Sequence, residues 1–197
     1  AIFRKNMGPT MPGIERVPSP NLYRGVLGRY ESKYLDYLEF VIRKEGEIGA
    51  FIAEPIRNTD VVIPSKKFWQ RVRSLCDEHN IFLIFDEIPT GLGRIGSMFV
   101  HQYFDVIPDV LCLGKGLGGG ILPLAAILTH ERYNKVNELS IGHYTHEKNP
   151  LCAAAGLATL EYIESEGLIA KVHSDEVFMR EKLEKMMHKH EIIGDIR

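Results

Sequence analysis

The sequence lacks the features that mark secreted, membrane-spanning or nucleic-acid-binding proteins. It has three cysteines in 197 residues and no Cys-x-x-Cys spacing, which predicts reduced thiols in a cytoplasmic protein. No apolar run reaches the ~18 residues of a membrane-spanning helix, and the N-terminus has no signal-peptide pattern. The net charge is only −2, so no basic field favours nucleic acid or an anionic membrane. We therefore expect small-molecule partners.

The composition predicts one well-packed core. Hydrophobic residues make up 45% of the chain and charged residues 25%, a balance typical of globular domains. The chain begins with Ala1 and ends abruptly at Arg197, so we expect a piece of a longer protein. Residues 1–30 contain repeated prolines and glycines without helical or strand periodicity, and they are predicted to be an extended connecting segment.

Hydrophobic periodicity predicts alternating strands and helices after residue 30. Helical spacing occurs over 31–43, 65–79, 150–164 and 167–188, and short apolar runs typical of buried strands occur at 48–56, 81–85, 110–113 and 122–128. This order predicts an α/β fold of three layers, with a mostly parallel sheet flanked by helices on both faces. We assign 31–165 to this domain and 166–197 to a helix leading to a further C-terminal domain.

Three polar residues follow the predicted strands at their carboxyl ends, where ligands of parallel sheets bind. They are Glu54, Asp86 and Lys115. A lysine can form an imine with the aldehyde of pyridoxal phosphate, and an aspartate can keep its pyridine nitrogen protonated. The glycines around Lys115 leave room for a bulky ligand. The alternatives are a solvated loop lysine, and an Asp86-Glu87 pair that caps a turn or serves a magnesium site.

Other ligand motifs are poorly supported. Gly91 to Gly96 matches G-x-G-x-x-G, but no acid follows about 20 residues later, where a dinucleotide site needs one. Gly116 stands where a Walker A motif needs Ser or Thr. His143 and His146 lack further ligands at suitable spacing, so no metal site is predicted.

A candidate phosphate-binding feature lies at the start of the helix predicted over 150–164. Asn149 and Pro150 open an alanine-rich helix, whose N-terminus offers backbone N–H groups and a positive dipole end. Thr145 stands just before it and can donate a hydroxyl.

Taken together, these motifs resemble the class III (ω-amino acid) aminotransferases, from about residue 7 to the end. The segments that carry the resemblance are Glu54-Pro-Ile, Leu83-Ile-Phe-Asp-Glu-Ile88, Thr90-Gly-Leu-Gly-Arg94, Pro108 to Gly120, Pro123-Leu-Ala-Ala126, and Thr145 with Asn149-Pro-Leu-Cys-Ala-Ala154. The resemblance implies the central large domain of a fold-type I pyridoxal phosphate enzyme.

The resemblance also implies roles for five residues. Lys115 would form the internal aldimine with pyridoxal phosphate and then shuttle a proton, and Asp86 would pair with the pyridinium nitrogen. Ile88 would pack on the ring, Thr145 would reach the cofactor phosphate of a partner subunit, and Glu54 would line the substrate pocket. The implied enzyme is a homodimer that transfers an amino group from an amino acid or amine to a keto acid.

The chain departs from the family pattern at several positions. Pro89 stands where Gln is usual, Ile95 where Thr is usual, and Asn58-Thr59 where a glycine-rich turn is common; His146 to Lys148 replaces a small, glycine-containing stretch. Epimerisation, decarboxylation and phospholyase chemistry on the same scaffold therefore stay open, as does an inactive fragment. The family's phosphate loop, ring-stacking aromatic residue and carboxylate-binding arginine have no counterpart in these 197 residues.

Overall fold

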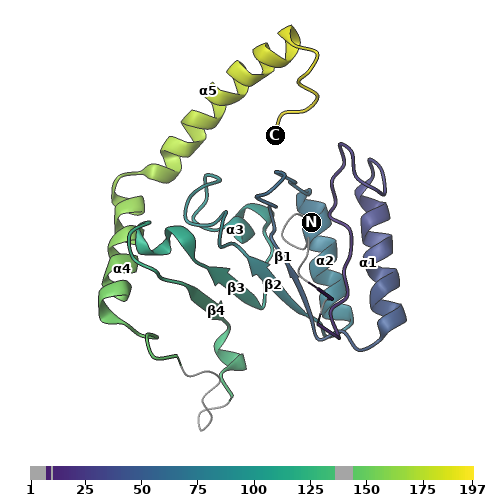
Figure 1. Ribbon diagram of the computed structural model, residues 1–197, viewed down its shortest axis with the longest axis horizontal. Helices are drawn as coiled ribbons and strands as arrows, with labels where there is room; N and C mark the ends of the chain where they lie inside the picture. The colour runs from purple at the N-terminus through teal and green to yellow at the C-terminus, as the bar shows by residue number, and fades with distance from the viewer. Residues whose placement is uncertain (1–7, 10, 136–143) are drawn as a thin grey trace.

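The computed structural model describes residues 8–9, 11–135 and 144–197. Within them the predicted helices and strands alternate, and a further short helix, which was not predicted, lies at Val100–Phe104 (Figure 1). The elements are α1 (Glu31–Glu45), β1 (Ala50–Ala53), α2 (Lys66–Glu78), β2 (Phe82–Asp86), α3 (Val100–Phe104), β3 (Val110–Leu113), the 3-10 turn η2 (Lys115–Gly118), β4 (Ala126–Thr129), the 3-10 turn η3 (Glu131–Tyr133), α4 (Pro150–Ser165) and α5 (Leu168–Lys189).

The four strands form one sheet in the order β1-β2-β3-β4. β1, β2 and β3 are parallel, with Ile52 opposite Ile84 and Ile84 opposite Val110, whereas β4 runs antiparallel to β3. The predicted α/β fold with a mostly parallel sheet is confirmed. Because β1, β2 and β3 are parallel, their carboxyl ends lie along the same side of the sheet.

The helix boundaries follow from local signals in the sequence. Ser65 caps α2, because its hydroxyl accepts a hydrogen bond from the Phe68 N–H at 3.1 Å. α1 ends at Gly46, whose φ of 75° lies in the left-handed region that glycine adopts without steric cost. The end of α1 and the start of α2 lie within two residues of the predicted positions.

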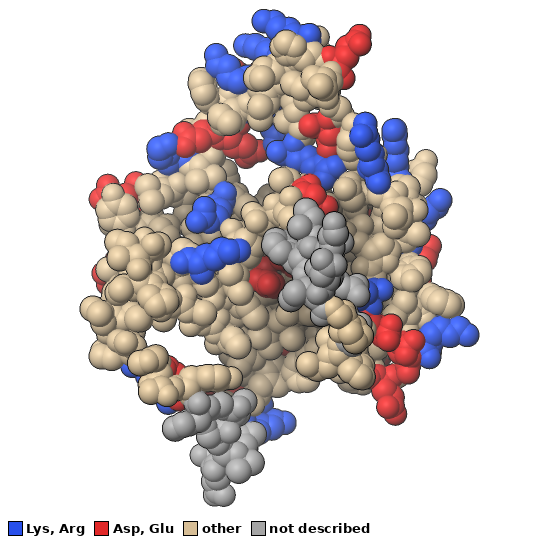
Figure 2. Space-filling model, in the orientation of Figure 1, with Lys and Arg blue, Asp and Glu red and all other residues tan. Residues whose placement is uncertain are grey.

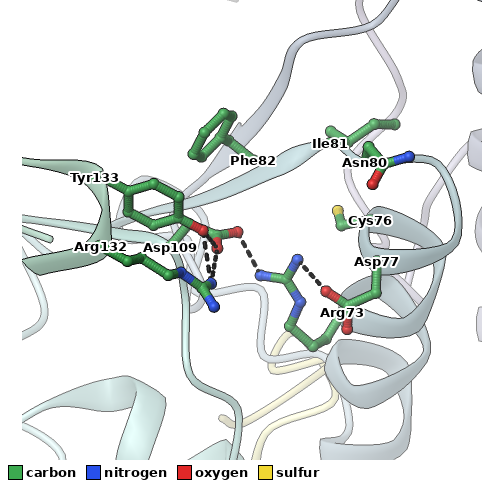
Figure 3. A pocket seen from close by; sticks show the side chains of 9 residues that line it. All are labelled: Arg73, Cys76, Asp77, Asn80, Ile81, Phe82, Asp109, Arg132 and Tyr133. Carbon is green, nitrogen blue, oxygen red and sulfur yellow. Dashed lines mark hydrogen bonds and ion pairs between the residues drawn. The ribbon is translucent and has the colours of Figure 1, made fainter. Parts of the chain in front are cut away.

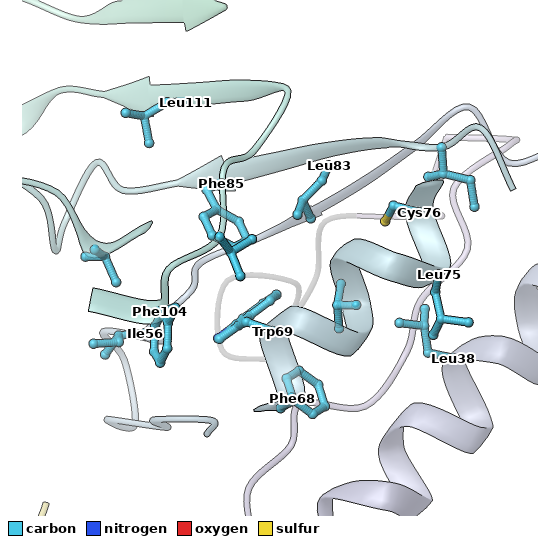
Figure 4. Packing of buried hydrophobic residues seen from close by; sticks show 14 of the residues in the cluster. Leu38, Ile56, Phe68, Trp69, Leu75, Cys76, Leu83, Phe85, Phe104 and Leu111 are labelled. Carbon is cyan, nitrogen blue, oxygen red and sulfur yellow. The ribbon is translucent and has the colours of Figure 1, made fainter. Parts of the chain in front are cut away.

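Helices α1, α2 and α3 supply the core on one face of the sheet. Trp69 on α2 is its centre: its ring packs edge-on against Phe85 of β2, with centroids 4.9 Å apart (Figure 4), and its Nε1 donates to the Pro55 carbonyl at 3.0 Å. Leu83 and Phe85 of β2 have no exposed surface. This layer is the main apolar burial of the fold.

The opposite face of the sheet carries exposed apolar side chains. Ile52 of β1 is 62% exposed and Ile127 of β4 is 73% exposed. Helices were expected on both faces of the sheet. Within the described residues, helices cover the face that carries Leu83 and Phe85, and the other face is exposed. The alternation of buried and exposed positions along β2 and β3 follows from the two-residue period of a strand.

Helices α4 and α5 lie beyond the β4 edge of the sheet, on the far side from α1, and α5 extends away from it (Figure 1). α4 approaches η2 closely, since a Cβ at Gly156 would lie 2.5 Å from Cδ2 of Leu124 and 3.5 Å from the Leu117 carbonyl.

No helix among the described residues is long and apolar enough to span a membrane. Lysines and arginines alternate with acids on the face seen in Figure 2.

The amino ends of the strands are held together by one carboxylate, that of Asp109. It accepts hydrogen bonds from Arg73 of α2 at 2.7 Å, from the Leu83 N–H of β2 at 2.8 Å and from Tyr133 of η3 at 2.6 Å (Figure 3). Arg132 adds a contact at 3.3 Å. Partial burial raises the pKa of Asp109, but the hydrogen bonds from Tyr133, Leu83 and Arg73 outweigh it and hold the pKa below its ordinary value.

We expect Asp109→Asn to lower the free energy of unfolding by about 1–3 kcal/mol near pH 7, because a neutral amide cannot accept from all these donors. Since the folded-state pKa is depressed, the stabilisation is complete above the ordinary pKa of about 3.9 and is lost as pH falls through the folded-state value. Urea unfolding of the two proteins across this range measures the difference.

The matched control is Asp105→Asn, whose side chain is 76% exposed and contacts Lys66. This change should alter stability by no more than about 0.5 kcal/mol. A stability difference for Asp109→Asn that stays constant as pH falls would contradict the ionic role of Asp109.

Candidate active site

The carboxyl ends of β2 and β3 bring three of the predicted residues together. Asp86 is the last residue of β2, Ile88 follows two positions later, and Lys115 follows β3 after Gly114. Asp86 lies opposite Cys112 of β3, and the Glu87 N–H donates to the Cys112 carbonyl at 3.0 Å. The parallel pairing of the two strands therefore sets the distance between aspartate and lysine.

Gly114 allows the lysine-bearing turn to approach Ile88. A Cβ at Gly114 would lie 3.3 Å from Cγ2 of Ile88, tighter than ordinary van der Waals contact. Lys115 itself is exposed and has φ of 46°, in the left-handed region that is costly for a residue with a side chain. Such strain is often found at functional sites. Its ammonium group makes no hydrogen bond or ion pair with any described residue.

Asp86 is oriented by its own turn. Its Oδ1 accepts a hydrogen bond from the Ile88 N–H at 3.1 Å, and its Oδ2 has no hydrogen-bond partner among the described residues. The strand register puts Asp86 opposite Cys112, and both lie on the less buried face of the sheet. Burial, and then the nearby charge of Asp86, raise the pKa of the Cys112 thiol. One oxygen is thus fixed and the other is available to a ligand.

Glu87 caps the start of α3, a role that the sequence patterns did not predict. Its side chain is fully buried and accepts hydrogen bonds from the Val100 N–H at 2.7 Å and the His101 N–H at 2.8 Å. It thereby satisfies two free N–H groups at the start of α3 and complements the positive helix end. The predicted alternative of a turn cap applies to Asp86, whose Oδ1 accepts from the Ile88 N–H, whereas Glu87 caps the start of α3.

The other two predicted residues stand apart from this group. Glu54 follows β1, and its Oε2 accepts from the Asn58 N–H at 2.9 Å, which closes the turn after the strand. Thr145 is exposed on the turn before α4 and has no polar contact with Glu54, Asp86 or Lys115. Asn149 caps α4, as predicted, by accepting from the Leu151 N–H at 3.0 Å.

Metal binding has no support among the described residues, which contain no cluster of three or more potential ligands. His146 lies exposed on the turn before α4, and His143 lies outside the described residues. The cavity in Figure 3, about 350 Å³ in volume, is lined by Asp109, Arg73 and their neighbours. It lies at the amino ends of the strands, opposite Lys115.

The group of Lys115, Asp86 and Ile88 fits pyridoxal phosphate. Among the described residues, Lys115 offers a primary amine without a polar partner, Asp86 offers a carboxylate oxygen without one, and Ile88 offers an apolar surface beside Gly114. These are an imine-forming group, an acceptor for a pyridinium N–H and a packing surface for an aromatic ring. No ion pair joins Asp86 and Lys115, so neither charge neutralises the other.

Comparison with known proteins identifies the family of this chain. The aminotransferase class-III family profile matches residues 1–197. The chain is 51% identical to the (R)-1-hydroxy-2-aminoethylphosphonate ammonia-lyase of Vibrio splendidus, covering 100% of this chain and 45% of that protein. It is 32% identical to the alanine/serine racemase of Pyrococcus horikoshii, covering 98% of this chain and 43% of that one.

Among solved structures, an amine transaminase from an uncultivated Pseudomonas species in its PLP-bound form superposes with a TM-score of 0.93 and 31% identity. The match covers 100% of this chain and 48% of that structure. The chain therefore spans about half the length of the relatives it matches.

We expect Glu87→Gln to lower the free energy of unfolding by about 1–3 kcal/mol, because the amide nitrogen would face one of the two N–H groups that Glu87 accepts from. Denaturant unfolding followed by circular dichroism measures the loss. Glu78→Gln on the exposed end of α2 is the matched control and should change little. Equal effects of both changes would show that the buried cap contributes nothing particular.

Proposed function

This chain belongs to the class-III aminotransferase family, and we propose that the protein containing it is a pyridoxal phosphate-dependent enzyme that transforms a primary amine. The observation that carries the proposal is the convergence of Lys115, Asp86 and Ile88 at one sheet edge. When bound, pyridoxal phosphate supplies an aldehyde that condenses with amines and a protonated ring that withdraws electrons.

The side chains of this chain would hold and move the protons of the reaction. Lys115 Nζ, which has no polar partner among the described residues, would hold the cofactor through its amine and would accept the proton from the substrate carbon that bears the amino group. Asp86 Oδ2 would keep a proton on the ring nitrogen, because a carboxylate beside that nitrogen raises its pKa. Ile88 would pack on the ring, and Glu54 would face the substrate from the end of β1.

The remaining expectations concern the whole protein. We propose a cytoplasmic homodimer in which Thr145 reaches the cofactor phosphate of the partner subunit. We also propose that 1–30 is a connecting segment, that 31–165 is the cofactor-binding domain and that 166–197 leads into a further domain. α5 supports this last division, because none of its residues is buried and Val177, Phe178 and Met179 are exposed.

Transamination between an amino acid or amine and a keto acid is the reaction that the family and the transaminase structures support. Elimination of ammonia is a second candidate with a specific observation in its favour. The identity to the ammonia-lyase is 51%, against 31% to the amine transaminase. Pro89 agrees with a change of reaction, since it replaces the Gln usual in the family and has no side-chain donor.

Product analysis distinguishes the two reactions. The full-length protein with pyridoxal phosphate is given 1-hydroxy-2-aminoethylphosphonate, with and without pyruvate, and ammonia and alanine are measured. Ammonia release without pyruvate identifies elimination, whereas alanine formation that requires pyruvate identifies transamination. Lys115→Ala should abolish either reaction because it removes the amine that moves the proton.

Lys66→Ala is the control, since Lys66 is exposed on α2 and pairs only with Asp105. It should retain activity. Turnover that survives Lys115→Ala would contradict the proposed role of Lys115. If neither product forms with this amine or with a panel of amino acids, the proposed function fails.

A further inference from the structure

A tightly bent loop follows the aspartate strand and carries an arginine, Arg94. Leu92, Gly93 and Gly96 have φ of 60°, 85° and 83°, so three of five consecutive residues lie in the left-handed region. Two backbone hydrogen bonds fix the bend, from the Gly93 N–H to the Met98 carbonyl at 3.1 Å and from the Gly96 N–H to the Gly93 carbonyl at 3.0 Å. The loop therefore presents Arg94 from a defined backbone.

Helices α4 and α5 support the back of this loop. A Cβ at Gly93 would lie 3.5 Å from side-chain atoms of both Ile163 and Ile169. A Cβ at Gly96 would lie 2.4 Å from the His173 ring. With these helices behind it, the loop faces the lysine-bearing turn η2.

The guanidinium of Arg94 lies beside that turn. A Cβ at Gly116 would lie 3.5 Å from Nη2 of Arg94 and 3.6 Å from Cδ1 of Leu92. Gly116 directly follows Lys115, so the arginine cation stands next to the backbone of the proposed imine-forming lysine.

Arg94 is exposed, and no acid among the described residues pairs with it. It makes no hydrogen bond or ion pair with any described residue. Several arginines of the fold are paired with acids: Arg73 contacts Asp109 and Asp77 at 2.7 Å, and Arg71 contacts Glu78 at 2.6 Å. An exposed guanidinium without a carboxylate partner among the described residues offers two parallel N–H donors to a ligand.

We propose that Arg94 is a specificity-determining residue that binds an oxyanion, a phosphonate or a carboxylate, on the amine substrate. The proposal rests on the proposed function, because it takes Lys115 as the reacting amine. A substrate whose anion pairs with Arg94 has its amino group directed towards the adjacent Lys115 turn. Arginine suits this task because its planar fork matches the two oxygens of either anion.

The test is calorimetric binding of ethylphosphonate and of propionate to the full-length, cofactor-loaded protein. Neither probe has an amino group, so binding is measured without reaction. Arg94→Gln should weaken the Kd of at least one probe on the order of 10- to 100-fold, the range expected for charge-assisted hydrogen bonds. Arg94→Lys should restore part of the affinity, because it keeps the charge and loses the fork.

Arg43→Gln is the matched control, since Arg43 is exposed on α1 and pairs only with Glu39. It should leave both affinities unchanged. Weakening of ethylphosphonate alone identifies a phosphonate substrate, and weakening of propionate alone a carboxylate. Unchanged affinity in Arg94→Gln, equal weakening in Arg43→Gln, or no binding of either probe to the wild type would overturn the proposal. The proposed function fails separately, if no amine is turned over.

Discussion

The parallel pairing of β1, β2 and β3 is the constraint on which the site depends. Because these strands run in the same direction, the residues that follow them meet at one edge. Burial of Leu83, Phe85 and Leu111 against the helices fixes the register. A slip of one residue would move these side chains to the open face and turn Asp86 away from it.

Charged side chains are paired at the amino ends of the strands, whereas Lys115 and Asp86 at the carboxyl ends form no ion pair among the described residues. At the amino ends, Asp109 contacts both Arg73 and Arg132, and this network ties α2, β2, β3 and η3 together. At the carboxyl ends, Lys115 and one oxygen of Asp86 have no polar partner among the described residues. Paired charges stabilise the structure, whereas charges left free beside an open surface can act on a ligand.

Sequence periodicity predicted the elements and the sheet edge because each depends on local patterns. Ser65, Gly46 and the apolar runs before Asp86 and Lys115 act within a few residues of their own positions. The contacts of Asp109, the burial of Glu87 and the place of Arg94 beside Gly116 could not be predicted. Each joins segments at least 13 positions apart, and nothing in the local pattern records such pairings.

The open face of the sheet was missed for a related reason. An apolar run such as residues 81–85 predicts a strand with two apolar faces but does not say what covers the second one. Within the described residues the helical cover lies on the face that carries Leu83 and Phe85, and Phe82 remains 42% exposed. The roles proposed for Glu54 and Thr145 likewise depend on molecules outside this chain, namely the substrate and the cofactor of a partner subunit.

The most direct test of the account is an experimental structure of the full-length protein with pyridoxal phosphate. We predict continuous density from Lys115 Nζ to the cofactor aldehyde carbon, with Asp86 Oδ2 within hydrogen-bonding distance of the ring nitrogen and Ile88 against the ring. A cofactor attached to another lysine, or bound away from the carboxyl ends of β2 and β3, would contradict it.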